Sequence, residues 1–332
     1  MMDAVTTGSM TAWTQSRYGG PEVVEATRIE VPSPAKGEVL LEVHAASINS
    51  GDVKIMRGEP LLIRPVFGLR RPRVATRGMD VAGTVVAVGD GVSQFAIGDE
   101  VMGELPGGTL AEYVAGPAAR LAPRPAGLAP AIAAALPLAG GTAWQALEAG
   151  GVGEGDRVLV IGASGGVGHY AVQLAAARGA EVWALCGARS EQLVASIGAV
   201  RTFDYRSTDA AALPDGSFDV VIDIAGTAPL RTLRRLVRRS GTLVLVSGEG
   251  SRFGGPIGRI LRSILLSPTP GPRVKPLAAV AKADVTRELA SLAVAGRIRP
   301  AIEVTFALDR AGEALAHVDD GHTVGKVVVT IG

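Results

Sequence analysis

The chain has 332 residues, with 33 Lys and Arg against 32 Asp and Glu and a formal net charge of +1. This length exceeds what one hydrophobic core usually serves, so the sequence predicts two domains. The balanced charge gives no electrostatic case for a nucleic acid as the main partner. Cys186 is the only cysteine. That count excludes an intramolecular disulfide and a multi-cysteine zinc lobe, and it is typical of a reducing cytoplasm.

The first part of the chain is predicted to be rich in β-strands. Residues 1–9 are small and polar and are expected to form a disordered leader, without the basic and apolar segments of a secretory signal. From residue 10 to about 121, short apolar runs alternate with turn residues. The predicted strands are 11–16, 23–30, 38–48, 81–88, 100–102 and 111–114.

An uncharged stretch, 125–147, comes next and must be tested as a membrane span. It consists mostly of Ala, Gly and Pro, and Pro130, Pro137 and the pair Gly140-Gly141 interrupt it. A spanning helix needs strongly apolar residues throughout. The sequence therefore favours a soluble, Ala-rich pair of helices.

From there on, predicted strands and helices alternate. The predicted strands are 158–161, 181–186, 200–205, 220–224 and 242–246, with helices at 166–177 and 190–197. Strands separated by helices imply right-handed crossovers and a doubly wound parallel sheet, so the fold class is α/β. The chain then returns to a helix from about 284 to Gly296, a helix at 310–318 and a strand at 326–331.

The segment 158–175 organises this α/β region. A buried strand, 158–161, leads into a Gly-dense turn and then into a helix with an apolar face. The turn has the pattern Ala163-x-Gly165-x-x-Gly168, the Gly-x-Gly-x-x-Gly fingerprint with Ala in its first place. Between a strand and a helix, this pattern favours a turn that binds the pyrophosphate of a dinucleotide. The alternative is a strand–helix turn with a structural role alone.

Several motifs occur in an order that resembles the medium-chain dehydrogenase/reductase superfamily, and within it the zinc-free quinone oxidoreductase branch. They are Ala45–Asp52, Gly78–Val85, Gly98–Val101, Ala139–Ala143, Gly162–Gly168 and Gly325–Val328. The resemblance covers nearly everything from Met10 to Gly332 and is strongest to reticulon-interacting and chloroplast-envelope quinone-oxidoreductase-like proteins. It implies a β-rich GroES-like catalytic domain (1–127 and 279–332), a Rossmann dinucleotide-binding domain (128–278) and a homodimer.

The zinc ligands of the superfamily are replaced in this chain. In the zinc enzymes, Cys stands at the position of Asn49, His at that of Met79, and a second Cys near Leu138. Catalytic zinc needs three ligands of Cys, His or carboxylate type, and Asp80 alone does not make a site. The sequence therefore predicts no metal, and it opposes zinc-dependent alcohol dehydrogenase activity, which stays an alternative.

NADPH is the predicted cofactor. Enzymes selective for NAD usually place Asp or Glu at the end of the second Rossmann strand. Here that strand ends with Cys186, Glu181 lies at its other end, and Arg189 follows with a guanidinium suited to a 2′-phosphate. The resemblance implies that Tyr205 lies along the adenosine phosphate. The alternatives are a solvent-facing Arg189 and a Tyr205 at the edge of the core.

The other cofactor contacts follow from the turn and from the resemblance. The resemblance places Thr142 and Asn49 at the nicotinamide end and has Lys326 reach the cofactor, the alternative being an exposed lysine that opens a strand. Gly226 follows the fourth strand, at the carboxyl edge where such sheets bind ligands. The full predicted cofactor set is Thr142, Ala163, Ser164, Gly165, Gly166, Val167, Gly168, Arg189, Tyr205, Ser247, Gly248 and Lys326.

The predicted reaction is hydride transfer from NADPH to a quinone or an α,β-unsaturated carbonyl. Such acceptors need orientation and exclusion of water rather than a Lewis acid. Asn49 and Asp52 are the candidate catalytic residues, although Asp52 also suits a cap for a helical turn at 53–57. Pro60 replaces the Tyr of enoyl-thioester reductases, which opposes fatty-acyl thioesters. A regulatory NADPH-binding protein with little turnover is the alternative from another class.

Three further features each allow a purely structural interpretation beside a functional one. Residues 257–266 are one-sided and apolar with flanking arginines, which suits membrane contact, although a lid or a subunit-packing helix is favoured. The Arg-rich segment 64–77 is expected to be a solvated face or the rim of a cleft. His169 is expected to be structural.

Overall fold

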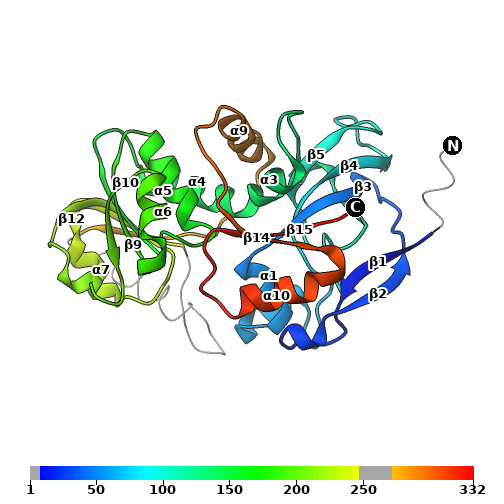
Figure 1. Ribbon diagram of the computed structural model, residues 1–332, viewed down its shortest axis with the longest axis horizontal. Coiled ribbons are helices and arrows are strands. Elements are labelled where there is room, and N and C mark those ends of the chain that lie inside the picture. Colours follow the sequence, from blue (N-terminus) through cyan, green and yellow to red (C-terminus); the bar gives the residue numbers. More distant parts are fainter. Residues whose placement is uncertain (1–7, 247–270) are drawn as a thin grey trace. The chain divides into compact units, whose positions relative to one another are not determined.

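The computed structural model describes residues 8–246 and 271–332 (Figure 1). The described residues form two compact units. The first draws on Met1–Glu59, Ile63–Gly141 and Ala281–Gly332, and the second on Pro60–Leu62 and Thr142–Val280. The division expected from the sequence places residues 128–141 with the dinucleotide-binding part, whereas here they belong to the first unit.

The second unit is built on a six-stranded parallel sheet. Its strands are β8 (Arg157–Ile161), β9 (Glu181–Cys186), β10 (Ala199–Asp204), β11 (Phe218–Asp223), β12 (Val237–Leu245) and β13 (Arg273–Pro276). They lie in the order β10-β9-β8-β11-β12-β13, and every neighbouring pair is parallel. Counted from β8, this is the 3-2-1-4-5-6 order of a doubly wound dinucleotide-binding sheet. The predicted fold class is confirmed.

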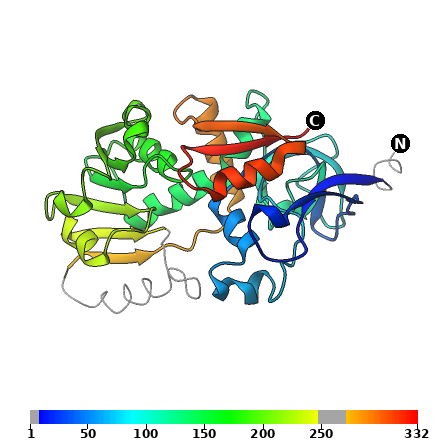
Figure 2. The same ribbon diagram turned by 60° about the horizontal axis from the view of Figure 1, so that its bottom comes forward.

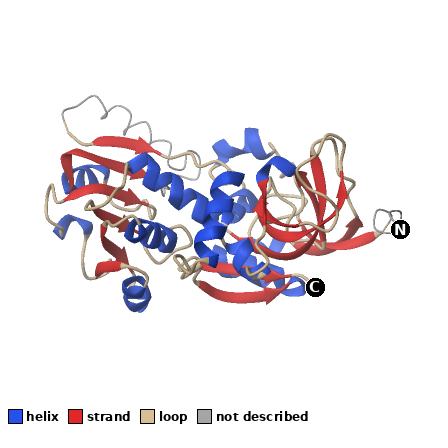
Figure 3. Ribbon diagram, turned by 90° about the horizontal axis from the view of Figure 1, so that it is seen from above, coloured by secondary structure: helices blue, strands red, loops and turns tan. Residues whose placement is uncertain are grey.

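Helices flank this sheet on both faces, which explains why its central strands are apolar throughout. The helices are α5 (Gly168–Ala177), α6 (Glu191–Ser196) and α7 (Leu230–Leu236). Leu159 and Ile161 of β8 share a core cluster with Leu233 and Leu236 of α7. Because successive side chains of a strand point to opposite faces, residues 158 and 160 face the other side. Figure 1 shows α5 and α7 on the two sides of the strands, and Figure 3 shows the helices in blue around the strands in red.

The first unit is built on a mostly antiparallel sheet. Its strands are β3 (Glu38–Ile48), β4 (Asp80–Val88), β5 (Glu100–Glu104), β6 (Tyr113–Pro117), β7 (Leu121–Pro123), β14 (Ile302–Ala307) and β15 (Lys326–Thr330). The order is β14-β15-β3-β4-β5-β7, with β6 also paired to β3. The C-terminal strands β14 and β15 are parallel to each other, drawn orange and red in Figure 2. A separate hairpin joins β1 (Ser9–Thr14) to β2 (Glu25–Glu30).

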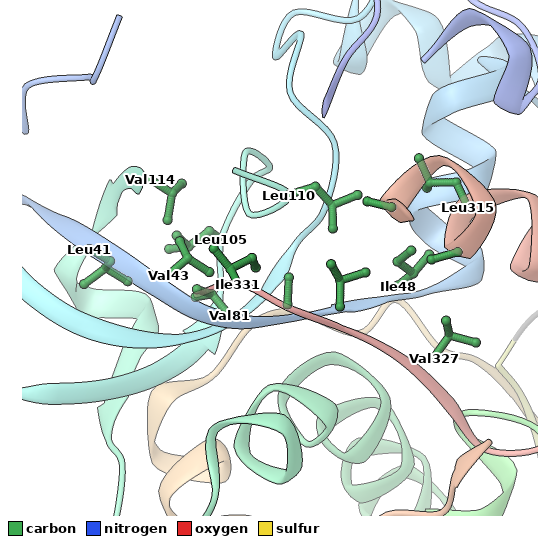
Figure 4. Packing of buried hydrophobic residues seen from close by; sticks show 14 of the residues in the cluster. Leu41, Val43, Ile48, Val81, Leu105, Leu110, Val114, Leu315, Val327 and Ile331 are labelled. Atoms are coloured by element: carbon green, nitrogen blue, oxygen red, sulfur yellow. The ribbon is translucent and has the colours of Figure 1, made fainter. Parts of the chain in front are cut away.

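The long strand β3 organises the core of the first unit. Its side chains Leu41, Val43 and Ile48 are buried in one cluster with Val81 of β4 and Leu315 of a C-terminal helix (Figure 4). The C-terminal part of the chain thus returns to complete the core that the N-terminal part begins. This return agrees with the split domain that the resemblance implies.

The remaining helices connect the strands within the two units. They are α1 (Ser50–Arg57), α2 (Arg64–Phe67), α3 (Pro130–Ala135), α4 (Pro137–Gly150), α9 (Ala283–Val294) and α10 (Ala311–Asp319), with short 3₁₀ turns η1 (Pro21–Val23), η2 (Leu61–Ile63), η3 (Ala118–Arg120), η4 (Ala188–Ser190), η5 (Ala210–Ala212) and η6 (Leu308–Arg310). The predicted Ala-rich helical pair corresponds to α3 and α4. Within the ranges 8–246 and 271–332, no helix is long and apolar enough to cross a bilayer.

Candidate functional site

The glycine turn of the second unit has a backbone that only glycine allows. Gly162 has φ +85°, which disfavours any residue with a Cβ. A Cβ on Gly168 would lie 2.1 Å from the carbonyl oxygen of Gly162, well inside van der Waals contact. The turn therefore folds tightly against the start of α5, and this contact accounts for the third glycine of the fingerprint.

Hydrogen bonds fix the turn to the sheet. The amides of Gly162 and Ala163 both donate to the carbonyl of Leu185 in β9, at 3.0 Å each. Nδ1 of buried His169 lies 3.0 Å from the carbonyl of Gly165, so the ring holds the turn from inside. His169 thus has the structural place expected of it. Residues 164–167 are half-buried and remain accessible.

The turn lies where the strand order of the sheet reverses. Beyond β8, the amide of Ala225 donates to the carbonyl of Ile161, and a Cβ on Gly162 would be 3.1 Å from that amide nitrogen. The ends of β8 and β11 therefore meet at the turn. Ligands of open α/β sheets bind at this switch point, against amides at a helix N-terminus. The geometry fits the pyrophosphate of a dinucleotide.

Arg189 and Tyr205 follow the carboxyl ends of β9 and β10. Both are exposed, and the Tyr205 ring lies beside Gly187, at 3.5 Å from where a Cβ would stand. Tyr205 is 49% exposed, so its alternative as a core-edge residue is not favoured. Glu181 lies at the opposite end of β9, where it accepts hydrogen bonds from Arg157 and Trp183. Ser247 and Gly248 lie outside the described residues, as does the segment 257–266.

In the first unit, Lys326, Asp80 and Asn49 form a buried polar cluster. The Lys326 ammonium donates to Oδ1 of Asn49 and lies 3.4 Å from Oδ2 of Asp80. Nδ2 of Asn49 donates to the same Asp80 oxygen at 2.9 Å. All three side chains are at most 6% exposed. The alternative of an exposed Lys326 is wrong: the residue opens β15, as expected, but its ammonium is enclosed.

Asp52 extends this cluster through the start of α1. Asn49 is the N-cap of that helix, and its backbone amide donates to Oδ2 of Asp52 at 2.8 Å. Asp52 is therefore not the N-cap of a turn at 53–57, as considered from the sequence. The helix α1 begins at Ser50, three residues earlier, and Asp52 closes a capping box from its third position. Both ends of the Asn49 amide already have partners, so the structure favours a positioning role for Asn49 over direct contact with a substrate.

Burial governs the protonation of the carboxyl groups here. Burial raises the pKa of Asp52 to about 6, although the hydrogen bond from the Asn49 backbone amide acts in the opposite direction. Burial also raises the pKa of Glu104 to about 7, with the charge of Asp80 acting in the same direction. For Lys326 and Asp80, burial lowers the ammonium pKa and raises the carboxyl pKa, while each charge opposes the shift of the other. Asp52 and Glu104 can therefore hold protons near neutral pH.

The cluster joins two positions that hold zinc ligands in the zinc enzymes of the resembled superfamily. Asp80 bonds Asn49 through one oxygen and accepts the backbone amide of Leu138 through the other, at 3.0 Å. The third position is Met79, a weak ligand. No group of three or more His, Cys, Asp or Glu side chains among the described residues could hold a metal ion. In this chain, Asp80 and Lys326 bond to Asn49, and Asp80 also bonds to Leu138. The zinc ion joins the corresponding positions in the zinc enzymes.

A cavity of about 210 Å³ lies beside Asp52, entirely within the first unit. Its walls are mostly apolar. The lining residues are Asp52, Ile55, Val66, Phe67, Pro72, Arg73, Val74, Thr76, Arg77, Gly78, Met79, Pro106 and Gly107. Of the two expectations for segment 64–77, a solvated face or a cleft rim, several of its residues fit the second. The cavity is smaller than the 300–1,000 Å³ of typical ligand pockets, so it suits a compact reacting group.

Sequence reasoning missed part of this site. Glu104 had no motif to mark it, because only the pairing of β5 with β4 sets it opposite Asp80. Phe67 and Arg77 line the cavity and lie in the segment 64–77, which was expected as a possible cleft rim but without a role for either residue. The one available signal was the run of five arginines without an acid between Glu59 and Asp80.

Comparisons with known proteins agree with this architecture. Residues 35–126 match the alcohol dehydrogenase GroES-like domain, and residues 197–329 match the zinc-binding dehydrogenase family. The chain is 36% identical to the chloroplast envelope quinone oxidoreductase homolog of Arabidopsis thaliana, over 94% of this chain and 95% of that protein. It is 31% identical to the NADPH-dependent alkenal/one oxidoreductase of the same plant, over 98% and 81%.

Among solved structures, the quinone oxidoreductase of Coxiella burnetii superposes with a TM-score of 0.84 at 27% identity, covering 98% of this chain and 100% of that one. The fold and site thus define an oxidoreductase of the medium-chain dehydrogenase/reductase superfamily. Within that superfamily, the chain belongs to the quinone oxidoreductase family. The resemblance stated from the sequence is confirmed, and the protein is an enzyme that uses a nicotinamide cofactor.

Proposed function

We propose that this enzyme is an NADPH-dependent, zinc-independent reductase of quinones or α,β-unsaturated carbonyls. The observation that supports it most is the donor set at the three zinc-ligand positions. These positions hold the amide of Asn49, the thioether of Met79 and the aliphatic side chain of Leu138. The Asn49 amide is already hydrogen-bonded to Lys326 and Asp80. These groups fit reduction of an activated acceptor better than alcohol oxidation, which needs a Lewis acid.

The residues of the second unit fit a dinucleotide. The turn 163–168 would hold the pyrophosphate, Arg189 would bind a 2′-phosphate, and Tyr205 would lie along the adenosine. Thr142 and Lys326 are proposed at the nicotinamide end, with Ser247 and Gly248 completing the set. The bound cofactor supplies a hydride.

The first unit supplies orientation and a proton. The cavity beside Asp52 would hold the acceptor and exclude water from it. Delivery of a hydride to the β-carbon of an enone leaves negative charge on the α-carbon and oxygen. A protonated Asp52 carboxyl would give its proton to that α-carbon and regain one from solvent. Asn49 would keep Asp52 in place through the backbone amide bond at the start of α1.

A panel of acceptors tests the function. We expect the purified protein to oxidise NADPH in the presence of a benzoquinone or an enal, measured by loss of nicotinamide absorbance, and to ignore simple alcohols. Chelator treatment should leave the rate unchanged. Tight NADPH binding with no turnover across quinones, enals and enoyl thioesters would instead support the regulatory alternative. Activity that depends on added zinc would support an alcohol dehydrogenase.

The choice of cofactor is tested by Arg189→Ala. Loss of a charge-assisted contact to the 2′-phosphate should raise KM for NADPH by about tenfold or more, and KM for NADH by less than about twofold. Arg239→Ala, at an exposed arginine of β12, is the matched control. Equal effects of Arg189→Ala on both cofactors would remove Arg189 from this role.

We also propose that the enzyme is a cytoplasmic homodimer. The single cysteine favours a reducing compartment, and the resemblance implies the dimer. Light scattering on the purified chain checks the second point, because a monomeric mass would contradict it.

A further inference from the structure

Three exposed arginines, Arg70, Arg71 and Arg73, lie on the segment that forms one wall of the cavity beside Asp52, and Arg73 itself lines the cavity. We call these three residues the basic rim. From residue 60 to residue 79 the chain has five arginines and no acidic residue, although the whole protein has a net charge of only +1. This segment is thus a local concentration of positive charge. A second run of five arginines lies at 231–239, but there Arg235 and Arg238 pair with aspartates.

The arginines of this segment form no salt bridge with a carboxylate in the part of the chain that the structure describes. Arg73 donates to the carbonyl of Pro65 at 3.1 Å, and Arg64 donates to the carbonyl of Gly58 at 3.0 Å. Buried Arg77 donates to the carbonyls of Val74 and Ala75. Neutral carbonyls orient the guanidinium groups of Arg64 and Arg73 without cancelling their charge, whereas the charge of Arg77 also interacts with that of Asp52. A guanidinium has five donors, so most of those of Arg73 remain for a ligand.

The loop that presents the rim is built to hold one shape. The amide of Arg73 donates to the carbonyl of Phe67 at 2.7 Å, and the Tyr18 hydroxyl donates to the carbonyl of Gly68 at 2.5 Å. Gly68 has φ +125°, and a Cβ there would lie 1.9 Å from the carbonyl oxygen of Arg71. The rim is therefore preorganised, which reduces the entropy lost when a ligand binds.

Size and polarity then describe the ligand. The cavity accommodates a compact apolar group, so a longer acceptor must extend out of it past the rim. Val66 in α2 and Leu69 in the loop that follows it are 64% and 71% exposed, which suits an aliphatic segment. We propose that the preferred acceptor is an amphiphilic anion, with its enone or quinone head in the cavity and a carboxylate on its tail bound by the basic rim. This inference rests on the proposed reductase function and specifies its substrate.

The test compares two acceptors that differ in one charge: an enone with a terminal carboxylate on an alkyl chain, and its methyl ester. We expect kcat/KM to be about tenfold higher for the acid than for the ester, because KM is lower for the acid while kcat is similar. Salt should reduce this preference, because exposed charges are screened within a Debye length of about 10 Å at 0.1 M. Arg73→Gln should cut the acid-to-ester ratio by about three- to fivefold, and Arg70→Gln by less. Arg287→Gln, at an exposed arginine of α9, should leave it unchanged.

Binding without turnover separates this proposal from the function on which it rests. Calorimetry with a saturated carboxylate of the same length should show binding to the wild type that Arg73→Gln weakens. Equal kcat/KM for acid and ester, or a ratio that the variants do not move, would overturn the proposal while the reductase function stands. Failure to reduce either acceptor, with calorimetric binding intact, would instead reject the reductase. Arginine-dependent binding to anionic lipid vesicles without preference for the acid would assign the rim to a membrane and also overturn the proposal.

Discussion

Replacing Lys326 by methionine is expected to destabilise the first unit by about 3–5 kcal/mol. The substitution keeps much of the side-chain volume but leaves the Asp80 carboxylate buried without its cation, and removal of one partner of a buried pair costs about this much. The melting temperature from differential scanning calorimetry should fall accordingly. Lys36→Met, at an exposed lysine of the same unit, should change it by less than about 0.5 kcal/mol in equivalent free energy.

The double variant Lys326→Met/Asp80→Asn shows whether charge pairing is the cause. With both charges gone, the amide oxygen introduced at position 80 can still accept the Leu138 amide, so we expect most of the lost stability to return. The cost of Lys326→Met alone should also shrink as the pH falls. In that variant Asp80 has a pKa above its unfolded value, so protonation below that pKa relieves the buried charge. A double variant as unstable as the single one would refute the ion-pair explanation.

The second unit was predicted well from the sequence because each of its strands and turns is specified by residues close together in the chain. Strand β9 was predicted with the bounds Glu181–Cys186 that the structure has, because a run of β-branched and aliphatic residues ends at a glycine. The glycine turn was recognisable because close backbone approach leaves no room for a Cβ. Strands β13 and β14 were missed. Arg273–Pro276 has little apolar character, whereas Ile302–Ala307 does alternate apolar and polar residues, so its strand pattern was present in the sequence and was overlooked.

The polar cluster could not be predicted in the same way. Lys326 opens the last strand, 246 residues after Asp80, and only the pairing of β15 with β3 and of β3 with β4 brings the two together. An exposed lysine and a buried one at the start of a strand have the same local sequence. The cavity is also a product of tertiary structure, since its walls come from α1, α2 and the loops around them. Positions that had lost their zinc ligands were visible in the sequence, but what replaced the metal was not.

Asp52→Asn is expected to lower kcat for an enone by about a hundredfold while leaving quinone reduction within about threefold. General acid catalysis contributes a factor of this size, and carbon protonation of an enolate needs it. The oxygen of a hydroquinone anion takes a proton from water readily and does not. The asparagine can still accept the Asn49 amide through Oδ1, so α1 should keep its start, and an unchanged melting temperature would confirm this.

The pH profile distinguishes a proton donor from a positioning residue. Burial raises the pKa of Asp52 to about 6, so the acid form is full below that pH and is lost above it. For the wild type, kcat/KM with an enone should be level below about pH 6 and fall towards tenfold per pH unit above it. The variant should lack this break, and quinone turnover should lack it in both proteins. If Asp52→Asn slows both acceptors equally, or if the wild-type enone profile is flat from about pH 5 to about pH 8, Asp52 positions the site and the proton comes from solvent.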